Sequence, residues 1–254
     1  TFSTSGLVGS DSVMSVTGLA SGTNYSATPY ADSLSAASGS GLDNYTINYV
    51  NGSLTINKAS LMVTGANRIV TYNGATQTNA VATVTGQQGS DSFTISGYAS
   101  GTNAATYIDN LSVSGSALSN YAVTYNNGSL VIGKANLTII GNTRSVTYNA
   151  GSQTNTYSTS GLVGSDSVSS VTGLASGTNY SATAYADNLS AVSGSGLDNY
   201  TVSYVNGSLT INKASLTVTG ANNTVTYNSA VQTNSGASYS GQQGSDSFSI
   251  SGYA

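Results

Sequence analysis

The chain has 254 residues and a net charge of −4, and only 6% of its residues are charged. It contains no His, Cys or Trp, and its nine acidic residues are all Asp. Without His or Cys there is no Ser-His or Cys-His catalytic pair and no usual zinc ligand set, so we expect no enzyme. Five Lys and Arg are too few to follow a phosphate backbone, which argues against a nucleic-acid partner.

Composition predicts an all-β protein. Glu is absent and Lys and Leu are scarce, whereas Thr, Val, Tyr, Ser and Asn are abundant. No apolar stretch is long enough to cross a membrane, so we expect no membrane insertion. The chain opens in the middle of its own repeat pattern, and we therefore interpret it as a fragment of a longer protein.

An internal repeat is the main signal in the sequence. Residues 1–79 recur with few changes as 156–234, a period of 155 residues. Within that period the sequence Lys-Ala-Ser/Asn-Leu starts at Lys58, Lys134 and Lys213, after intervals of 76 and 79 residues. A solenoid coil repeats at roughly 20–30 residues and a propeller blade at roughly 40–50. The intervals of 76 and 79 residues are longer than either and fit a small independent β-domain.

Two domain types therefore alternate along the chain. We predict a truncated type A repeat at 1–57, a complete type B repeat at 58–133, a complete type A repeat at 134–212 and a truncated type B repeat at 213–254.

Each complete repeat is expected to hold six or seven short strands. In the repeat that starts at Lys58, alternation and turn residues predict strands at 69–72, 80–85, 92–97 and 105–113. That number of strands suggests a small sandwich or half-barrel. A short helical turn over 166–171, with Asp166 as its N-cap, would instead admit a β-grasp-like domain.

Each repeat is predicted to end in a β-hairpin. Asn51-Gly52 is suited to a type I′ turn, which would place Tyr49 opposite Leu54 and Ile47 opposite Ile56 on one core-facing side. The same pattern surrounds the next two Asn-Gly pairs, with Tyr125 opposite Leu130, Val123 opposite Ile132, Tyr204 opposite Leu209 and Val202 opposite Ile211.

The junctions between repeats are short. Residues 56–63 run from one predicted strand into the next without Pro, Gly or a Ser-rich spacer. Few dihedral angles are free to absorb a bend there, so we expect the repeats to form an elongated rod.

These motifs resemble the MBG and YDG families of bacterial surface repeats, found in tandem in large secreted adhesins of the filamentous-haemagglutinin type. The resemblance is carried by 59–61 followed by Val-Thr-Tyr-Asn-Gly at 70–74, by Ser-Gly-Leu-Val-Gly-Ser-Asp at 160–166, and by the closing strand pair at 199–211. It implies an extracellular, multi-domain stalk at the bacterial surface with no catalytic residues. The chain departs from the families in having Asn73 where Tyr-Asp-Gly has Asp, and Ser229 in place of Gly74.

Calcium is the one metal to consider, because Asp and backbone oxygens are the ligands on offer. The candidates are Asp11, Asp91, Asp166 and Asp246 in Gly-Ser-Asp-Ser turns, while the other Asp residues are scattered. No run resembles an EF-hand, and Asp capping a turn explains the same pattern. We therefore expect no cofactor, with calcium as the alternative.

The junction lysines Lys58, Lys134 and Lys213 are candidates for an isopeptide crosslink to Asn, which would need a desolvated Lys beside a carboxyl group. At a strand start, a solvated Lys is the alternative reading.

Tyrosine could bind glycans by ring stacking. The three candidates that we single out are Tyr30, Tyr107 and Tyr185, from a wider set outside the predicted hairpins that adds Tyr25, Tyr98, Tyr180 and Tyr253. Tyr as core filler is the alternative.

The sequence thus predicts a stalk or spacer segment of a large extracellular bacterial adhesin or biofilm-matrix fibre, which projects a distal binding region. Its expected partners are neighbouring repeats of the same chain. Two alternatives stay open: a glycan-binding repeat module, and a filament that assembles by pairing of exposed edge strands with other fibre chains, since the strands carry little of the Lys that discourages such pairing.

Overall fold

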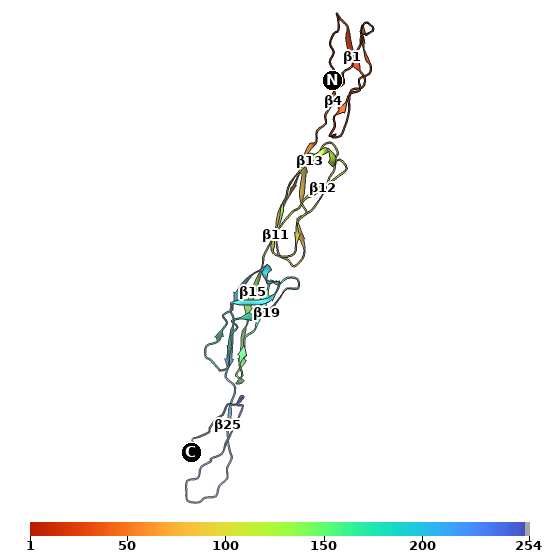
Figure 1. The fold of residues 1–254 in the computed structure, drawn as a ribbon. Coiled ribbons are helices and arrows are strands. Elements are labelled where there is room, and N and C mark those ends of the chain that lie inside the picture. The colour runs from red at the N-terminus through yellow and green to blue at the C-terminus, as the bar shows by residue number, and fades with distance from the viewer. Residues whose placement is uncertain (252–254) are drawn as a thin grey trace. The chain divides into compact units, whose positions relative to one another are not determined.

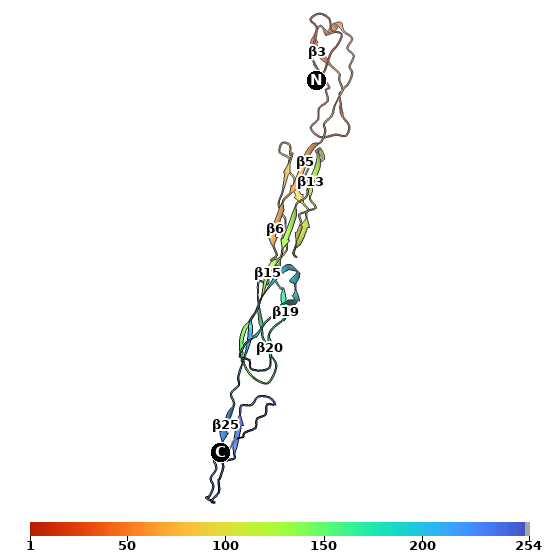
Figure 2. The same ribbon diagram turned by 90° about the vertical axis from the view of Figure 1, so that its left-hand side faces the viewer.

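The computed structural model describes residues 1–251, and these residues form an all-β protein. Figures 1 and 2 show the strands along the chain. These residues divide into two compact units. Unit 1 comprises Thr1–Arg68, Thr78–Ser100 and Thr106–Val131, and unit 2 comprises Ile69–Gln77, Gly101–Ala105 and the residues from Ile132 onward. The division falls inside the predicted repeat 58–133, because part of that repeat groups with the next one. No helix among residues 1–251 is long and apolar enough to span a membrane.

The complete repeat at 134–212 lies wholly in unit 2 and shows the fold best. Its elements, in chain order, are β15 (Ala135–Gly141), β16 (Thr143–Thr147), β17 (Gln153–Thr154), β18 (Tyr157–Ser160), β19 (Ser167–Thr172), β20 (Ser176–Gly177), β21 (Tyr185–Ala186), β22 (Ala191–Ser195), the 3-10 helix η3 (Leu197–Asn199), β23 (Tyr200–Val205) and β24 (Ser208–Asn212).

Two parallel strand pairs form the backbone of this repeat. β15 pairs with β23 from Ala135↔Tyr200 to Ile140↔Val205, and β16 pairs with β24 from Thr143↔Ser208 to Thr147↔Asn212. The segment β15–β16 and the segment β23–β24 therefore run side by side in the same direction and pass together from one sheet into the next. We call this pair of segments the parallel ribbon. The first sheet has the order β18-β15-β23 and the second the order β16-β24-β21, while β19-β22 and β17-β20 form two-stranded sheets.

The predicted closing hairpins are wrong. β23 and β24 flank Asn206-Gly207 but do not pair with each other, because each pairs instead with an N-terminal strand of the repeat. Neither Asn206 nor Gly207 adopts the positive φ of a type I′ turn. The Asn206 side chain instead accepts a hydrogen bond from the Leu189 N–H at 2.9 Å. The Asn-Gly pair is thus the point where the chain crosses between two sheets.

The core of the repeat follows from this parallel arrangement. Leu137 and Ile139 of β15 are fully buried, as are Leu209 and Ile211 of β24. Leu209 and Ile211 pack with Ala175, Tyr148 and Tyr185. The tyrosines predicted to face the core around the Asn-Gly pairs do not fill it: Tyr125 is 46% exposed, and Tyr49 and Tyr204 are half-buried. Tyr72, Tyr121 and Tyr200 are the buried ones.

The repeat at 58–133 contains the equivalent elements. They are β5 (Ala59–Gly65), β6 (Asn67–Thr71), β7 (Gln77–Thr78), β8 (Ala82–Thr85), β9 (Thr94–Ser96), β10 (Ser100–Gly101), β11 (Ala105–Ile108), β12 (Ser112–Ser114), η2 (Leu118–Asn120), β13 (Tyr121–Asn126) and β14 (Ser129–Gly133). β6, β8 and β9 confirm three of the strands predicted for this repeat, with shifted ends, whereas the single strand predicted at 105–113 is divided into β11 and β12.

In unit 1 this repeat packs two layers together. β5 pairs in parallel with β13 and antiparallel with β8 (Figure 2), and β12 pairs with β9. One apolar cluster joins the two sheets, with Leu61 and Val63 from β5 against Val113 from β12 and Tyr121 from β13. The sandwich expectation therefore holds for this layer pair.

The first and last repeats contain fewer strands. The first has β1 (Ser12–Val16), β2 (Tyr30–Ala31), β3 (Ala37–Ser40), η1 (Leu42–Asn44) and β4 (Ser53–Leu54); the described part of the last has β25 (Thr217–Gly220) and β26 (Ala237–Ser240). β1 pairs with β3, β2 with β4, and β25 with β26, all antiparallel.

The predicted helical turn over 166–171 is also wrong. Residues from Ser167 onward form β19, and Asp166 caps no helix. The 3-10 helices lie elsewhere, each immediately before a tyrosine: Tyr45, Tyr121 or Tyr200. Tyr121 and Tyr200 are the first residues of β13 and β23. Two of the helices follow Gly41 and Gly196, which adopt a left-handed conformation that other residues rarely take.

Candidate functional site at the repeat junctions

A buried aspartate holds the crossing point of the complete repeat. Asp187 is 4% exposed, and its Oδ1 accepts hydrogen bonds from the Ala175 N–H at 2.7 Å and from Asn155 Nδ2 at 3.0 Å. Its Oδ2 accepts from the Gly207 N–H and from the same Asn155 nitrogen, each at 2.9 Å. Three segments far apart in sequence therefore meet on one carboxylate. The dipoles of these N–H groups stabilise the negative charge of the carboxylate.

The backbone approaches this carboxylate so closely that only glycine fits. A Cβ atom on Gly141 would lie 1.9 Å from Asp187 Oδ2, and one on Gly207 would lie 2.3 Å from the Asn142 carbonyl oxygen. The two segments of the parallel ribbon cross from one sheet to the next at these glycines. The Asn155 Oδ1 atom, also buried, has no hydrogen-bond partner.

This arrangement around an aspartate, which we call the hub, recurs in the repeat 58–133 and in part in the first repeat. Asp109 is 2% exposed and accepts from the backbone of Ala99 and Gly128 and from Asn79 Nδ2. In the first repeat Asp32 accepts from the N–H groups of Ala20 and Gly52, at 2.7 and 3.0 Å.

A second aspartate receives a tyrosine hydroxyl from its own repeat. The Tyr200 hydroxyl donates to Asp166 Oδ2 at 2.8 Å and accepts from the Val163 N–H at 2.9 Å, which fixes the Gly-Ser-Asp-Ser turn against β23. The equivalent bonds join Tyr45 to Asp11 at 2.8 Å and Tyr121 to Asp91 at 2.6 Å.

The same aspartate also receives a tyrosine from the preceding repeat. The Tyr72 hydroxyl donates to Asp166 Oδ2 at 2.8 Å across the junction at Lys134, and its ring meets that of Tyr200 edge-on at 5.5 Å. Tyr148 reaches across the next junction to Asp246, with its hydroxyl 2.9 Å from Oδ2. We call these contacts the tyrosine bridges.

An asparagine of the 3-10 helix makes a second tie across the junctions. Asn120 Oδ1 accepts from the Tyr25 N–H at 2.8 Å, and its Nδ2 donates to Asn24 Oδ1 at 3.0 Å. Asn199 binds the equivalent loop of the repeat before it, where its Oδ1 accepts from the Ala104 N–H at 2.8 Å. We call these contacts the asparagine bridges.

The junction lysines differ between the two kinds of junction. Lys58 Nζ lies 4.9 Å from the Tyr25 ring centre, and Lys213 Nζ lies 4.8 Å from that of Tyr180. These distances fit cation–π contacts. At the position equivalent to Tyr25 the middle junction has Ala104, so Lys134 meets no tyrosine ring at that position.

The bridges change the acidity of the tyrosines. The hydrogen bond to Asp166 raises the pKa of Tyr72 above its ordinary value of 10.0, because a phenolate would face the carboxylate. Asp246 raises the pKa of Tyr148 in the same way. For Tyr200, burial is the largest cause that raises the pKa.

The structure places the predicted calcium and crosslink candidates in different surroundings. Among the calcium candidates, Asp11, Asp91, Asp166 and Asp246 each accept a tyrosine hydroxyl, and no group of three or more His, Cys, Asp or Glu able to hold a metal lies among residues 1–251. The lysines Lys58, Lys134 and Lys213 are exposed, whereas the crosslink requires burial.

The glycan candidates are half-buried. The Tyr30 hydroxyl donates to the Asn24 carbonyl oxygen at 2.9 Å, and that of Tyr185 donates to the Asn179 carbonyl oxygen at 3.0 Å. Tyr107 is also half-buried within β11 and has an interaction of its own. Tyr253 lies outside the described residues.

The sequence reading missed the hubs and the bridges. Asp32, Asp109 and Asp187 occupy equivalent repeat positions, and so do Asn79 and Asn155. Recurrence of a charged residue inside an otherwise apolar and Ser/Thr-rich unit was the signal that could have identified the hub. The bridges had no comparable signal, because their partners lie more than 90 residues apart.

Comparison with known protein families, curated proteins and solved structures found no significant match for this chain.

Proposed function

We propose that the chain is a structural stalk segment of a large extracellular bacterial adhesin or matrix fibre, in which successive repeats carry a distal binding region away from the cell. The observation that carries this proposal is the set of ties across the repeat junctions. Each tie uses side chains that the repeat supplies anew in every copy, so the same joint can be made by duplication of the sequence.

Two features of the junctions favour a stalk over a flexible tether. Only Lys134 separates β14 from β15, so the covalent link is one residue long. Beside it, the Tyr72 bridge and the Asn199 bridge contact the next repeat at two separate points. A link held at three points resists bending and twisting, because motion about one point strains the other two.

The polar side chains of the chain serve this architecture. Asp187 and Asp109 organise the interior of their repeats, and Asp166 and Asp246 receive the tyrosine bridges. We therefore assign these repeated aspartates to the maintenance of the fold rather than to the binding of a substrate.

Small-angle X-ray scattering tests the stalk directly. We expect the scattering of an elongated particle whose cross-section matches one repeat, and a globular profile of the same mass would contradict the proposal. Immunolabelling of intact bacterial cells with antibodies to this segment tests the extracellular location, since an intracellular protein would label only after permeabilisation.

A further inference from the structure

Two buried tyrosines share one carboxylate oxygen at the junction at Lys134. Tyr72 comes from the repeat before the junction and Tyr200 from the repeat after it. Their hydroxyls both donate to Asp166 Oδ2, each at 2.8 Å. The two rings meet edge-on with their centres 5.5 Å apart, and Tyr72 is 6% and Tyr200 3% exposed. The pair is therefore fixed both at its hydroxyls and at its rings.

This geometry brings together the parts of the two rings that are joined in dityrosine. The bond in dityrosine links the two ortho carbons, which are the ring carbons next to those that carry the hydroxyls. Because both hydroxyls bind one oxygen, the hydroxyl ends of the two rings lie within two hydrogen-bond lengths of each other. Reacting groups that are already held side by side couple far more readily than groups that must first meet by diffusion.

We propose that Tyr72 and Tyr200 are a site of oxidative crosslinking, at which a one-electron oxidant, such as a haem peroxidase intermediate formed from hydrogen peroxide, joins two successive repeats covalently. Each phenol loses one electron to the oxidant and one proton to Asp166. The two phenoxyl radicals then form a bond between their ortho carbons, and the hydrogens on those carbons move to the oxygens. In total, two electrons and two protons leave the protein and reduce one hydrogen peroxide to two water molecules.

Asp166 is placed to accept the protons. Removal of an electron makes a phenol hydroxyl strongly acidic, so its proton passes along the existing hydrogen bond to the carboxylate. Asp166 is half-buried, and it passes the first proton on to water before the second oxidation. The Val163 N–H donates to the Tyr200 hydroxyl oxygen at 2.9 Å and holds that ring in place until its partner is oxidised.

Burial favours coupling within the pair over coupling between molecules. A radical on Tyr125, which is 46% exposed, meets other chains in solution. Radicals on Tyr72 and Tyr200 are covered by protein and meet each other. An electron can leave a buried ring without direct contact between that ring and the oxidant. The crosslink needs only this folded junction, so it does not depend on the stalk proposal.

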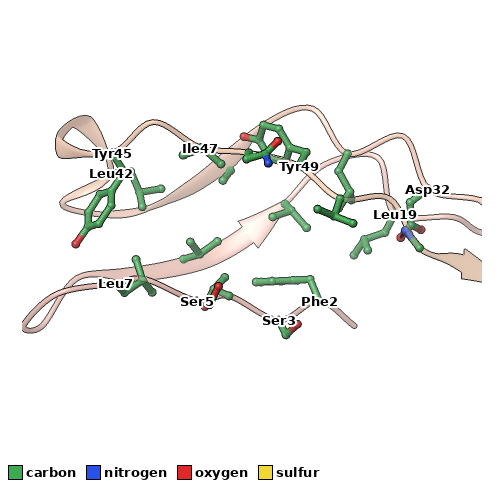
Figure 3. Close-up of a pocket in the computed structure, with 18 of the residues that line it drawn as sticks. Phe2, Ser3, Ser5, Leu7, Leu19, Asp32, Leu42, Tyr45, Ile47 and Tyr49 are labelled. Carbon is green, nitrogen blue, oxygen red and sulfur yellow. Dashed lines mark hydrogen bonds between the residues drawn. The ribbon is translucent and has the colours of Figure 1, made fainter.

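Two equivalent tyrosines have different neighbours and serve as internal comparisons. Tyr121 donates to Asp91 at 2.6 Å, but the ring that meets it edge-on at 5.2 Å is that of Phe93, which has no hydroxyl to oxidise. In the first repeat, Tyr45 lies beside Leu42 in the pocket that Figure 3 shows. Neither neighbour can form a phenoxyl radical, so we expect neither tyrosine to couple in this way.

Peptide mapping after oxidation tests the site. The whole chain, at low concentration, is oxidised with tris(bipyridyl)ruthenium(III) generated by light and persulfate, then denatured and digested with trypsin. Tyr72 lies in the tryptic peptide 69–134 and Tyr200 in the peptide 145–213. We expect a linked product whose mass is that of the two peptides together less two hydrogens, and which shows dityrosine fluorescence. Fragment spectra should place the link at these two tyrosines.

Three comparisons show whether the folded site directs the reaction. Tyr72→Phe should abolish the linked product, whereas the matched control Tyr125→Phe, in the same peptide, should leave it unchanged. Asp166→Asn should slow its formation several-fold at neutral pH, with recovery at higher pH as hydroxide takes up the protons. Oxidation in concentrated urea should not give the product, because the folded junction aligns the rings.

The unmodified chain decides the proposal even if a variant folds poorly. Absence of the linked peptides from the oxidised, folded chain would overturn the proposal, and so would a link confined to other tyrosines. A linked product that persists in Tyr72→Phe or in urea would also overturn it. An Asp166→Asn chain that reacts at the unmodified rate would overturn the part assigned to the carboxylate.

Discussion

The buried aspartate of each complete repeat, Asp109 or Asp187, is stabilised by hydrogen bonds from backbone and amide N–H groups. Asp187 accepts hydrogen bonds from Ala175, Asn155 and Gly207, so it links three segments that are far apart in the sequence. Desolvation of a carboxylate is costly unless such donors are already in place. The hub therefore forms only when the whole repeat is folded, which makes folding of the repeat cooperative.

Replacing this carboxylate should be severe. Asp187→Ala leaves the N–H groups of Ala175 and Gly207 and the Asn155 amide without an acceptor, and each buried donor left unpaired costs about 1–3 kcal/mol. We expect the free energy of unfolding to fall by about 3 kcal/mol or more, measured by urea denaturation. The matched control is Asp198→Ala in the same repeat, an exposed position where the expected change is within about 0.5 kcal/mol.

The bridging tyrosines predict a loss of stability in alkali. The pKa of Tyr72 and of Tyr148 is raised on folding, so the folded form favours the neutral phenol. The stabilisation is fully present below the ordinary value of 10.0 and disappears as the pH rises through the raised pKa. Absorbance titration of tyrosinate should show a Tyr72→Phe variant losing one late-ionising group. A variant whose late-ionising group is still present would contradict the assignment.

At the scale of elements, the parallel ribbon decides the fold. The strands and their alternation were predictable, because Leu137, Ile139, Leu209 and Ile211 follow a period of two and are all buried. The pairing was not, since Asn206-Gly207 is locally the best hairpin signal in the repeat. The closing strands β23 and β24 pair in parallel with strands 60 or more residues earlier instead of with each other, because this arrangement buries both of them in the two sheets.

The same reasoning explains what could be predicted of the candidate site. The short junction at 56–63 was predicted from the missing spacer, and in the structure β5 begins at Ala59, directly after Lys58. Asp166 was noticed as a turn residue, but its partner Tyr72 lies in another repeat and reaches it only through the folded junction. Long-range side-chain pairs of this kind leave no local pattern in a single sequence.

A glycine pair tests the ribbon crossing. Gly141→Ala would place a Cβ atom 1.9 Å from Asp187 Oδ2 and 2.7 Å from the Gly207 nitrogen. The two segments of the ribbon cannot move apart to make room for this atom without breaking the hydrogen bonds of the hub. We therefore expect this variant to lose the cooperative unfolding of its repeat, measured by circular dichroism during heating. Gly151→Ala is the control, because its nearest neighbour would be an Asn149 side-chain oxygen at 3.4 Å. Equal effects of the two changes would argue against the crossing as the critical contact.

At the scale of the whole chain, the tyrosine and asparagine bridges connect each repeat to the next by side-chain hydrogen bonds as well as by the backbone. Residues 69–77 and 101–105 group with the following repeat in the same compact unit. The boundary of a sequence repeat is therefore not the boundary of a structural unit. Stability at one junction depends on the two repeats that it joins, as in other tandem arrays.

Limited trypsin digestion can measure the strength of one joint. The chain has only five Lys and Arg, and Lys134 lies at the junction bridged by Tyr72 and Asp166. Tyr72→Phe should raise the rate of cleavage after Lys134 several-fold, because local opening exposes the backbone more often. Cleavage after Lys58 is the internal control and should not change. A uniform increase at every site would indicate general unfolding instead of a weakened joint.

The parallel ribbon also determines how a repeat bears a pulling force. The chain enters the complete repeat at Ala135, at the start of the ribbon, and leaves at Asn212, at its end. Tension applied through the two junctions therefore acts along the strands in opposite directions, and loads the hydrogen bonds of both parallel pairs in shear. Bonds loaded in shear must break together, whereas those of a closing hairpin would open one after another. A repeat built in this way resists extension through the geometry of its ends.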